Sequence, residues 1–144
     1  MKNWRIDYRG NGVSSLSIIP VDIGFQGEDP ATDFRGAGIL GLKNLHFYVN
    51  SHNEESMKIY LNSVQKESEY FFASGGIYIS LKISEWVKEG IFDRIFEDCV
   101  DNRSSLSMVD TIYFNIFKEF DYYWMQLKEK NIMVFNEEIV LISD

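Results

Sequence analysis

The pattern of apolar and polar positions predicts helices along most of the chain, and it is clearest in the last third. From Ser107 onward, apolar residues recur at intervals of three and four, which places them on one face of a helix. These apolar positions are Val109, Ile112, Tyr113, Ile116, Phe117, Phe120, Trp124 and Leu127. The charged positions that fall mainly outside this face are Asp110, Lys118, Glu119, Asp121 and Lys128. The spacing therefore predicts a long, buried helix.

Three shorter amphipathic helices are expected before it. The first runs from about Ala37 to Tyr48 and ends at the polar run 50–53, the second lies in residues 54–71, and the third, in 71–90, closes on Gly90. The apolar positions that mark them are, in order, Leu42, Leu45 and Val49 beside Ile39 and Phe47; Met57, Tyr60, Leu61 and Val64; and Ile79, Ile83, Trp86 and Val87. The Gly75–Gly76 pair is a candidate break between the second and third helices.

These elements predict an all-α fold with one compact domain. A chain of 144 residues, of which 45% are hydrophobic, is long enough to bury a sizeable core. Pro20 and Pro30 are the only prolines, so nothing interrupts the later helices. Residues 1–22 are less regular and are expected to form an arm packed on a domain of residues 23–144. The apolar run 133–143 fits either a helix or a strand.

The acidic charge balance narrows the classes of partner. The chain has 14 Lys and Arg against 22 Asp and Glu, which gives a formal net charge of -8. This balance argues against a nucleic-acid-binding protein and against binding to an anionic membrane surface. Cys99 is the single cysteine, so no internal disulfide can form and a reducing compartment is expected. No apolar run has the form of a signal peptide or the length of a transmembrane segment, which predicts a cytoplasmic protein.

Cofactor, metal and nucleophile motifs are weak. Residues 36–41 fit the spacing G-x-G-x-x-G, whose glycines let a pyrophosphate approach backbone amides at a helix start. The strand that should precede this motif is missing, so close helix packing is the favoured role of these glycines, and no cofactor is predicted. His46, His52 and Cys99 lack ligand-like spacing and predict no metal site, and His46 is expected to be a partly buried residue of the first helix. The two histidines form no recognisable catalytic triad with a serine or cysteine.

The acidic residues around Arg35 leave several interpretations open. Glu28, Asp29 and Asp33 could provide the acid and base of a hydrolase, although local carboxylates are more often helix caps and ion-pair partners. Thr32 or Asp33 is well placed to cap the first helix. Arg35 either pairs with Asp29 or Asp33 and fixes the loop, or acts as an arginine finger. In the second case its planar, permanently charged guanidinium would stabilise the charge that spreads over the γ-phosphate during phosphoryl transfer.

The segment around Arg35 resembles the signature of the ELMO domain family. The stretch "IGFQGEDPATDFRGAGILGLKNLHFYV" matches the family pattern at Gly24, Phe25, Gln26, Pro30, Thr32, Asp33, Phe34, Arg35, Gly36, Gly38, Leu40, Leu42 and Leu45. The stretch "YFFASGGIYISLKISEWVKEG" is similar to the middle helix of the family. "YFNIFKEFDYYWMQLKEKNIMVFNEEI" is similar to its closing segment. The resemblance covers the chain from about Ile23 to the C-terminus.

The resemblance implies an all-α domain connected to small GTPases. In the ELMO-domain-containing branch, the arginine at the position of Arg35 is understood as the catalytic finger of a GTPase-activating protein for Arf and Arf-like GTPases. The large engulfment scaffolds of the family lack this arginine and work with a Dock-type exchange factor for Rac. The presence of Arg35 implies the activating branch, with Gln26, Asp29, Asp33 and Gly36 as partner-binding or loop-ordering residues. The alternatives are a non-catalytic module that binds a small GTPase or an exchange-factor scaffold in cytoskeletal or engulfment signalling, and an unrelated helical adaptor.

Overall fold

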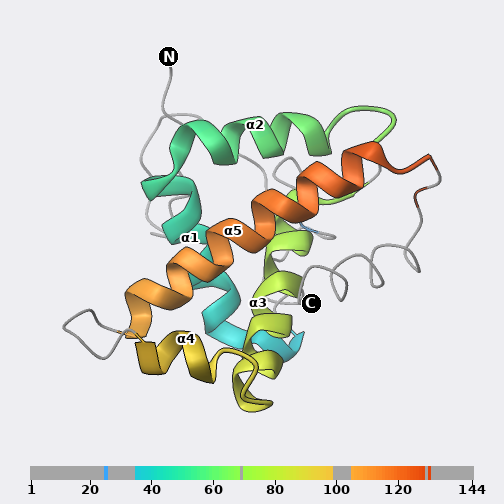
Figure 1. The fold of residues 1–144 in the computed structure, drawn as a ribbon. Coiled ribbons are helices and arrows are strands. Elements are labelled where there is room, and N and C mark those ends of the chain that lie inside the picture. Colours follow the sequence, from blue (N-terminus) through green and yellow to red (C-terminus); the bar gives the residue numbers. More distant parts are fainter. Residues whose placement is uncertain (1–24, 26–34, 69, 99–104, 129, 131–144) are drawn as a thin grey trace, which may run out of the picture.

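The computed structural model describes residues 25, 35–68, 70–98, 105–128 and 130 (Figure 1). This part of the chain contains only helices, so the all-α prediction is confirmed. In chain order they are the 3-10 helix η3 (Arg35–Ala37) and the α-helices α1 (Gly38–Ser51), α2 (Asn53–Ser63), α3 (Phe72–Lys88), α4 (Asp93–Asp98) and α5 (Ser105–Gln126). The expected N-terminal arm, the apolar run 133–143 and Cys99 lie outside the described residues.

The core lies where α1, α3 and α5 meet, with α2 along one side and α4 at the opposite end (Figure 1). Aromatic rings fill much of it. Phe117 of α5 stacks on Tyr48 of α1 and on Phe72 of α3, with ring centroids 5.2 Å apart in both pairs. The predicted apolar face of the long helix is confirmed, because Tyr113, Ile116, Phe117, Phe120 and Trp124 are all buried.

Two helix ends follow the sequence signals. The chain turns from α1 into α2 at His52, inside the predicted polar break. There the His52 ring stacks on Phe114 of α5 with a centroid distance of 4.2 Å. At the other end of the bundle, Gly90 follows the C-cap residue of α3 with a φ of 76°, a left-handed conformation that glycine adopts without a steric penalty.

Two predictions about the middle of the chain are wrong. Gly75 and Gly76 do not separate two helices but lie buried inside α3, where neighbouring helices approach its backbone closely. The predicted face of the second helix is wrong in part: Met57 and Tyr60 pack against the core, whereas Leu61 and Val64 are exposed. The helix instead turns Ser56, Ile59 and Ser63 inward, and Val64 follows its last residue.

Asp121 is a further exception, because the helical pattern placed it outside the apolar face of α5. Its side chain is only 5% exposed and accepts hydrogen bonds from the Tyr70 hydroxyl and from Asn62 Nδ2, both at 2.7 Å. Burial raises the pKa of the Asp121 carboxyl above its ordinary value, and the two hydrogen bonds act in the opposite direction. The carboxylate thereby joins α2 and the segment before α3 to α5. Within the described residues, no helix is both long and apolar enough to span a bilayer.

Candidate functional site

The candidate site is built around the first residue of η3. The structure describes the backbone of Arg35 in this 3-10 helix, whereas its side chain lies outside the described part. Gln26, Asp29 and Asp33, the other acidic or polar residues expected at the site, also lie outside it, as do Thr32 and Glu28. The residues expected to cap the first helix are not its N-cap: Ala37 holds that position in α1, without a side-chain hydrogen bond. The described geometry of the site is therefore that of η3 and the helices it touches.

Gly36 seats η3 directly on α3. A Cβ atom at Gly36 would lie 3.0 Å from Cδ1 of Leu81, closer than side chains normally approach each other. Ala37, the next residue, is buried. The glycine therefore lets the backbone that carries Arg35 lie against the second half of α3 (Figure 1). This contact gives Gly36 a packing role between η3 and α3.

The other glycines of the G-x-G-x-x-G spacing also have structural explanations. A Cβ at Gly41 would lie 3.2 Å from the Ala37 Cβ and 3.3 Å from Ile77 Cγ2, so this glycine allows α1 and α3 to pack closely. Gly38 lies at the joint between η3 and α1 and has open space around it. Its φ of 51° is a left-handed conformation that glycine adopts without a steric penalty. The geometry thus gives these glycines packing and conformational roles, as the packing interpretation predicts.

A buried polar contact also fixes α1 on α3. Asn44 Nδ2 donates a hydrogen bond of 3.0 Å to Ser80 Oγ, and Ser80 Oγ donates to the carbonyl of Gly76 at 3.1 Å. Both side chains are buried. The apolar spacing of the sequence did not predict this pair. Asn44 is a polar residue among the inward-facing positions of α1, such as Gly41 and Leu45, and this position could have indicated a buried hydrogen bond.

Lys82 is a charged residue on α3, the helix against which η3 packs. It follows Leu81, and its Nζ atom donates a hydrogen bond of 2.9 Å to Glu85 Oε2 and lies 5.6 Å from the centre of the Tyr78 ring. The bond to Glu85 is the main cause that raises the pKa of Lys82, so the ammonium stays charged at neutral pH. The sequence pattern did not single out Lys82.

The two histidines take different places. His46 was expected to be partly buried but is exposed, because the neighbouring positions Asn44, Leu45 and Tyr48 face the core and turn residue 46 outward. His52 packs against an aromatic ring, as described above. No group of three or more His, Cys, Asp or Glu that could hold a metal ion occurs in the described part of the chain.

Comparisons with known proteins point to one family. The model of the ELMO/CED-12 family matches residues 21–140. The chain is 40% identical to ELMO domain-containing protein B of Dictyostelium discoideum over 114 residues, which cover 79% of this chain and 39% of that protein. It is 34% identical to ELMO domain-containing protein 2 of Bos taurus and 32% identical to that of Homo sapiens. Each of these alignments spans 115 residues, or 80% of this chain and 39% of the relative.

The matched region is a part of these relatives. The chain spans about two fifths of the length of each of the three proteins. No solved structure matches the chain. The similarity therefore covers the helical domain described above, together with the segment that carries Arg35.

Proposed function

Because the chain belongs to the ELMO/CED-12 family, we propose that it is a GTPase-activating protein for a small GTPase of the Arf or Arf-like class. Membership of the family suggests a role in small-GTPase pathways generally. The Arf class and the activating role are the further steps of the proposal, and they rest on the arginine at position 35. Arg35 supplies its guanidinium to the active site of the GTPase, which itself contributes the nucleotide, Mg²⁺ and the group that orients water.

The observation that carries this proposal is the sequence Asp33-Phe34-Arg35-Gly36, whose arginine is the first residue of η3. The engulfment branch of the resembled family lacks this arginine, and the activating branch has it. The backbone after Arg35 is fixed by the approach of Gly36 to Leu81 and by the burial of Ala37. A fixed base favours an arginine finger, because less freedom is lost when the guanidinium meets the phosphates.

An arginine suits this reaction for a chemical reason. As the bond between the β- and γ-phosphates breaks, negative charge spreads over several oxygens at once. The guanidinium is planar, always charged and able to donate to two oxygens in parallel, whereas a lysine ammonium is a single point charge. A finger supplied in trans raises the rate of hydrolysis by about 10³-fold to 10⁵-fold.

Single-turnover GTP hydrolysis tests the proposal. A panel of GTP-loaded Arf and Arf-like GTPases is mixed with the native chain and with Arg35→Lys, both checked for matched folding by circular dichroism. Arg94→Lys is the control, because it makes the same change at an exposed arginine on α4. We expect acceleration by the native chain and by Arg94→Lys, and a loss of at least about 10²-fold with Arg35→Lys.

Equal acceleration by Arg35→Lys would refute the finger. If the native chain binds a panel member without accelerating hydrolysis, the chain is instead a non-catalytic module of the kind described above. In that case a search for an exchange-factor partner in the Rac pathway would follow.

A further inference from the structure

Gly38 separates η3 from the regular part of α1. It is the first residue of α1 and has a φ of 51°, and nothing lies within 4 Å of the place where its Cβ would be. A residue in this left-handed conformation breaks the helical path, so η3 is not a straight continuation of α1. The position of η3, and of the Arg35 backbone within it, therefore depends on the contacts that η3 makes with other helices.

Leu81 of α3 makes such a contact with the backbone of η3. A Cβ atom at Gly36 would lie 3.0 Å from Cδ1 and 3.7 Å from Cδ2 of Leu81, so both methyl groups of this side chain face the backbone of Gly36. Leu81 itself is half-buried and packs against the core. Because the Cα atoms of consecutive residues are about 3.8 Å apart, this contact lies a single peptide unit away from Arg35.

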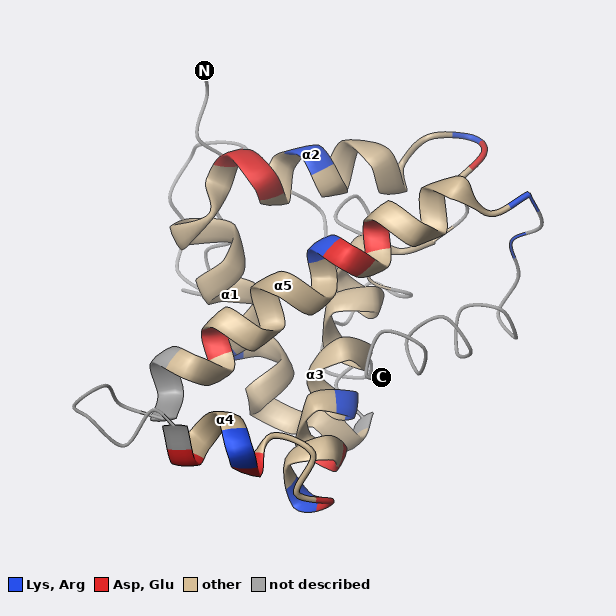
Figure 2. Cartoon of the chain, in the orientation of Figure 1, with Lys and Arg blue, Asp and Glu red and all other residues tan. Residues whose placement is uncertain are grey.

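The two segments that meet at this contact carry no charge. Residues 36–42 and 72–81 contain no Asp, Glu, Lys or Arg. In Figure 2 the charged segments of α3 gather toward its C-terminal end, after Leu81. The support of η3 is thus made of packing, whose strength depends on shape and distance. A shorter side chain at position 81 would leave a gap below Gly36 that no charged residue of these two segments can fill.

α3 gives Leu81 a fixed base. The preceding residue, Ser80, is buried, and its Oγ accepts a hydrogen bond of 3.0 Å from Asn44 Nδ2 of α1. This bond holds α1 and α3 together next to the contact between Leu81 and Gly36. A residue on a packed helix is placed more precisely than one on a loop, so Leu81 is suited to hold η3 in position.

We propose that Leu81 is a positioning residue for the arginine finger, an inference that rests on the proposed function. Leu81 acts through the backbone of η3: its methyl groups hold Gly36, and with it the backbone of Arg35, in one place before the GTPase binds. A misplacement of about 1 Å that is caused by a change far from the chemistry can lower a rate by about 10²-fold. The loss of Leu81 therefore reduces the rate within the complex and not the affinity for the GTPase.

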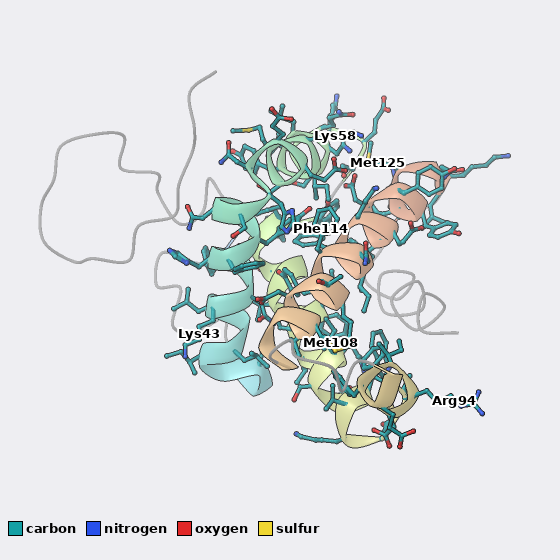
Figure 3. The ribbon with its side chains drawn as sticks, turned by 60° about the vertical axis from the view of Figure 1, so that its left-hand side comes forward. Lys43, Lys58, Arg94, Met108, Phe114 and Met125 are labelled. Carbon is teal, nitrogen blue, oxygen red and sulfur yellow. The ribbon has the colours of Figure 1, made fainter. Side chains whose placement is uncertain are left out.

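The test uses three variants of Leu81 and one control. Leu81→Ala removes the two methyl groups, Leu81→Val draws them back from Gly36 while most of the side chain is kept, and Leu81→Met conserves its volume. Leu127→Ala is the control, because it makes the same change at another half-buried leucine that packs against the core. Leu127 lies two residues after Met125, which Figure 3 places at the end of the molecule away from Lys43 and the start of α1.

Two quantities are measured for each variant: the rate constant of single-turnover hydrolysis at a saturating concentration of the chain, and the Kd for the same GTPase loaded with a non-hydrolysable GTP analogue. We expect Leu81→Ala to lower the rate constant by about tenfold or more and Leu81→Val to lower it less. Leu81→Met and Leu127→Ala should stay within about threefold of the native rate, and every Kd within about threefold of the native value. In an Arg35→Ala background, Leu81→Ala should cause no further loss, because the group through which it acts is gone.

Nitrogen-15 relaxation of the isolated chain measures the support of η3 without a GTPase. The order parameters of the Arg35, Gly36 and Ala37 amides should be about 0.85, the value of a rigid backbone, in the native chain and in Leu127→Ala. In Leu81→Ala they should fall toward about 0.6, with shifted amide resonances. Resonances and order parameters that stay native in Leu81→Ala would overturn the inference.

The outcomes distinguish this inference from the proposed function. If the native chain accelerates hydrolysis and the saturated Leu81→Ala complex reaches the native rate, the role of Leu81 is wrong and the finger stands. A higher Kd at an unchanged saturated rate, or an equal loss in the Arg35→Ala background, would also overturn the role of Leu81, because its effect would not pass through Arg35. A native chain that accelerates no member of the panel refutes the proposed function, and the positioning role falls with it.

Discussion

Replacing Gly76 with alanine is a direct measure of how closely α1, α3 and α5 approach one another. A Cβ atom at this position would lie 2.6 Å from the Tyr113 hydroxyl oxygen, 3.0 Å from Leu45 Cδ1 and 3.1 Å from Phe117 Cε1. Folded structures essentially never show a contact as short as the first. All three neighbours are buried and belong to two other helices, so none can move aside into solvent.

Two opposing terms set the size of the effect. Alanine is favoured over glycine in a helix interior by roughly 0.5–1 kcal/mol. Forcing an extra methyl group into a packed core costs about 1–3 kcal/mol, and three enclosed neighbours place Gly76 in the upper half of this range. The free energy of unfolding should therefore fall by about 1–2 kcal/mol, since the steric cost exceeds the helix gain.

Gly41→Ala provides the matched control. It makes the same chemical change in α1, where the added Cβ would lie 3.2 Å from the Ala37 Cβ and 3.3 Å from Ile77 Cγ2, so that neighbours must shift by only a few tenths of an ångström. The helix gain offsets much of this cost, and its stability should stay within about 1 kcal/mol of native. Urea unfolding followed by circular dichroism measures both variants. A Gly76→Ala variant as stable as Gly41→Ala would refute the close approach.

Three further predictions concern the packing and the joint next to the site. A double-mutant cycle of Asn44→Ala and Ser80→Ala should give a coupling free energy of about 0.5–1.5 kcal/mol in urea unfolding, because their hydrogen bond joins α1 to α3; additive losses would contradict it. Gly38→Ala should lower stability by about 1–2 kcal/mol through its φ of 51° alone, since nothing lies within 4 Å of the added Cβ, and Gly38→Asn should lose less; equal losses in thermal unfolding would argue against this cause. Burial raises the pKa of Tyr48 far above its ordinary value, and its hydroxyl has no hydrogen-bond partner within the described part of the chain. Above about pH 10 only the unfolded chain ionises at this position, so the free energy of unfolding of the native chain should fall as the pH rises further. Tyr48→Phe should be neutral or stabilising at pH 7, and its free energy of unfolding, measured in urea, should fall less above pH 10; an equal fall would contradict this cause.

The helices with a strong apolar repeat were predictable, and the contacts between them were not. α5 was found because Tyr113, Ile116, Phe117, Phe120 and Trp124 all recur at helical spacing and are all buried. The pattern could not show that Asp121 is buried too. Its partners, Tyr70 and Asn62, lie on other elements far along the chain.

The glycines show the same limit. Gly75 and Gly76 have the local character of a helix break, yet they lie in the first two turns of α3, where side chains of α1 and α5 pack against the backbone at Gly76. At the candidate site, the start of a helix near residue 37 was predictable from the apolar spacing. The support of η3 by Leu81 was not, since it depends on how two separate helices pack.

Rate measurements on saturated complexes test whether Arg35 acts on the GTP bound to a partner. The rate constant of single-turnover hydrolysis by an Arf-class GTPase is determined at saturating concentrations of the native chain, Arg35→Lys and Arg94→Lys, with binding to the GTPase measured in parallel. We expect Arg35→Lys to bind as the native chain does but to lose at least about 10²-fold in rate, while Arg94→Lys retains the native rate. A saturated Arg35→Lys complex that hydrolyses GTP at the native rate would contradict the claim.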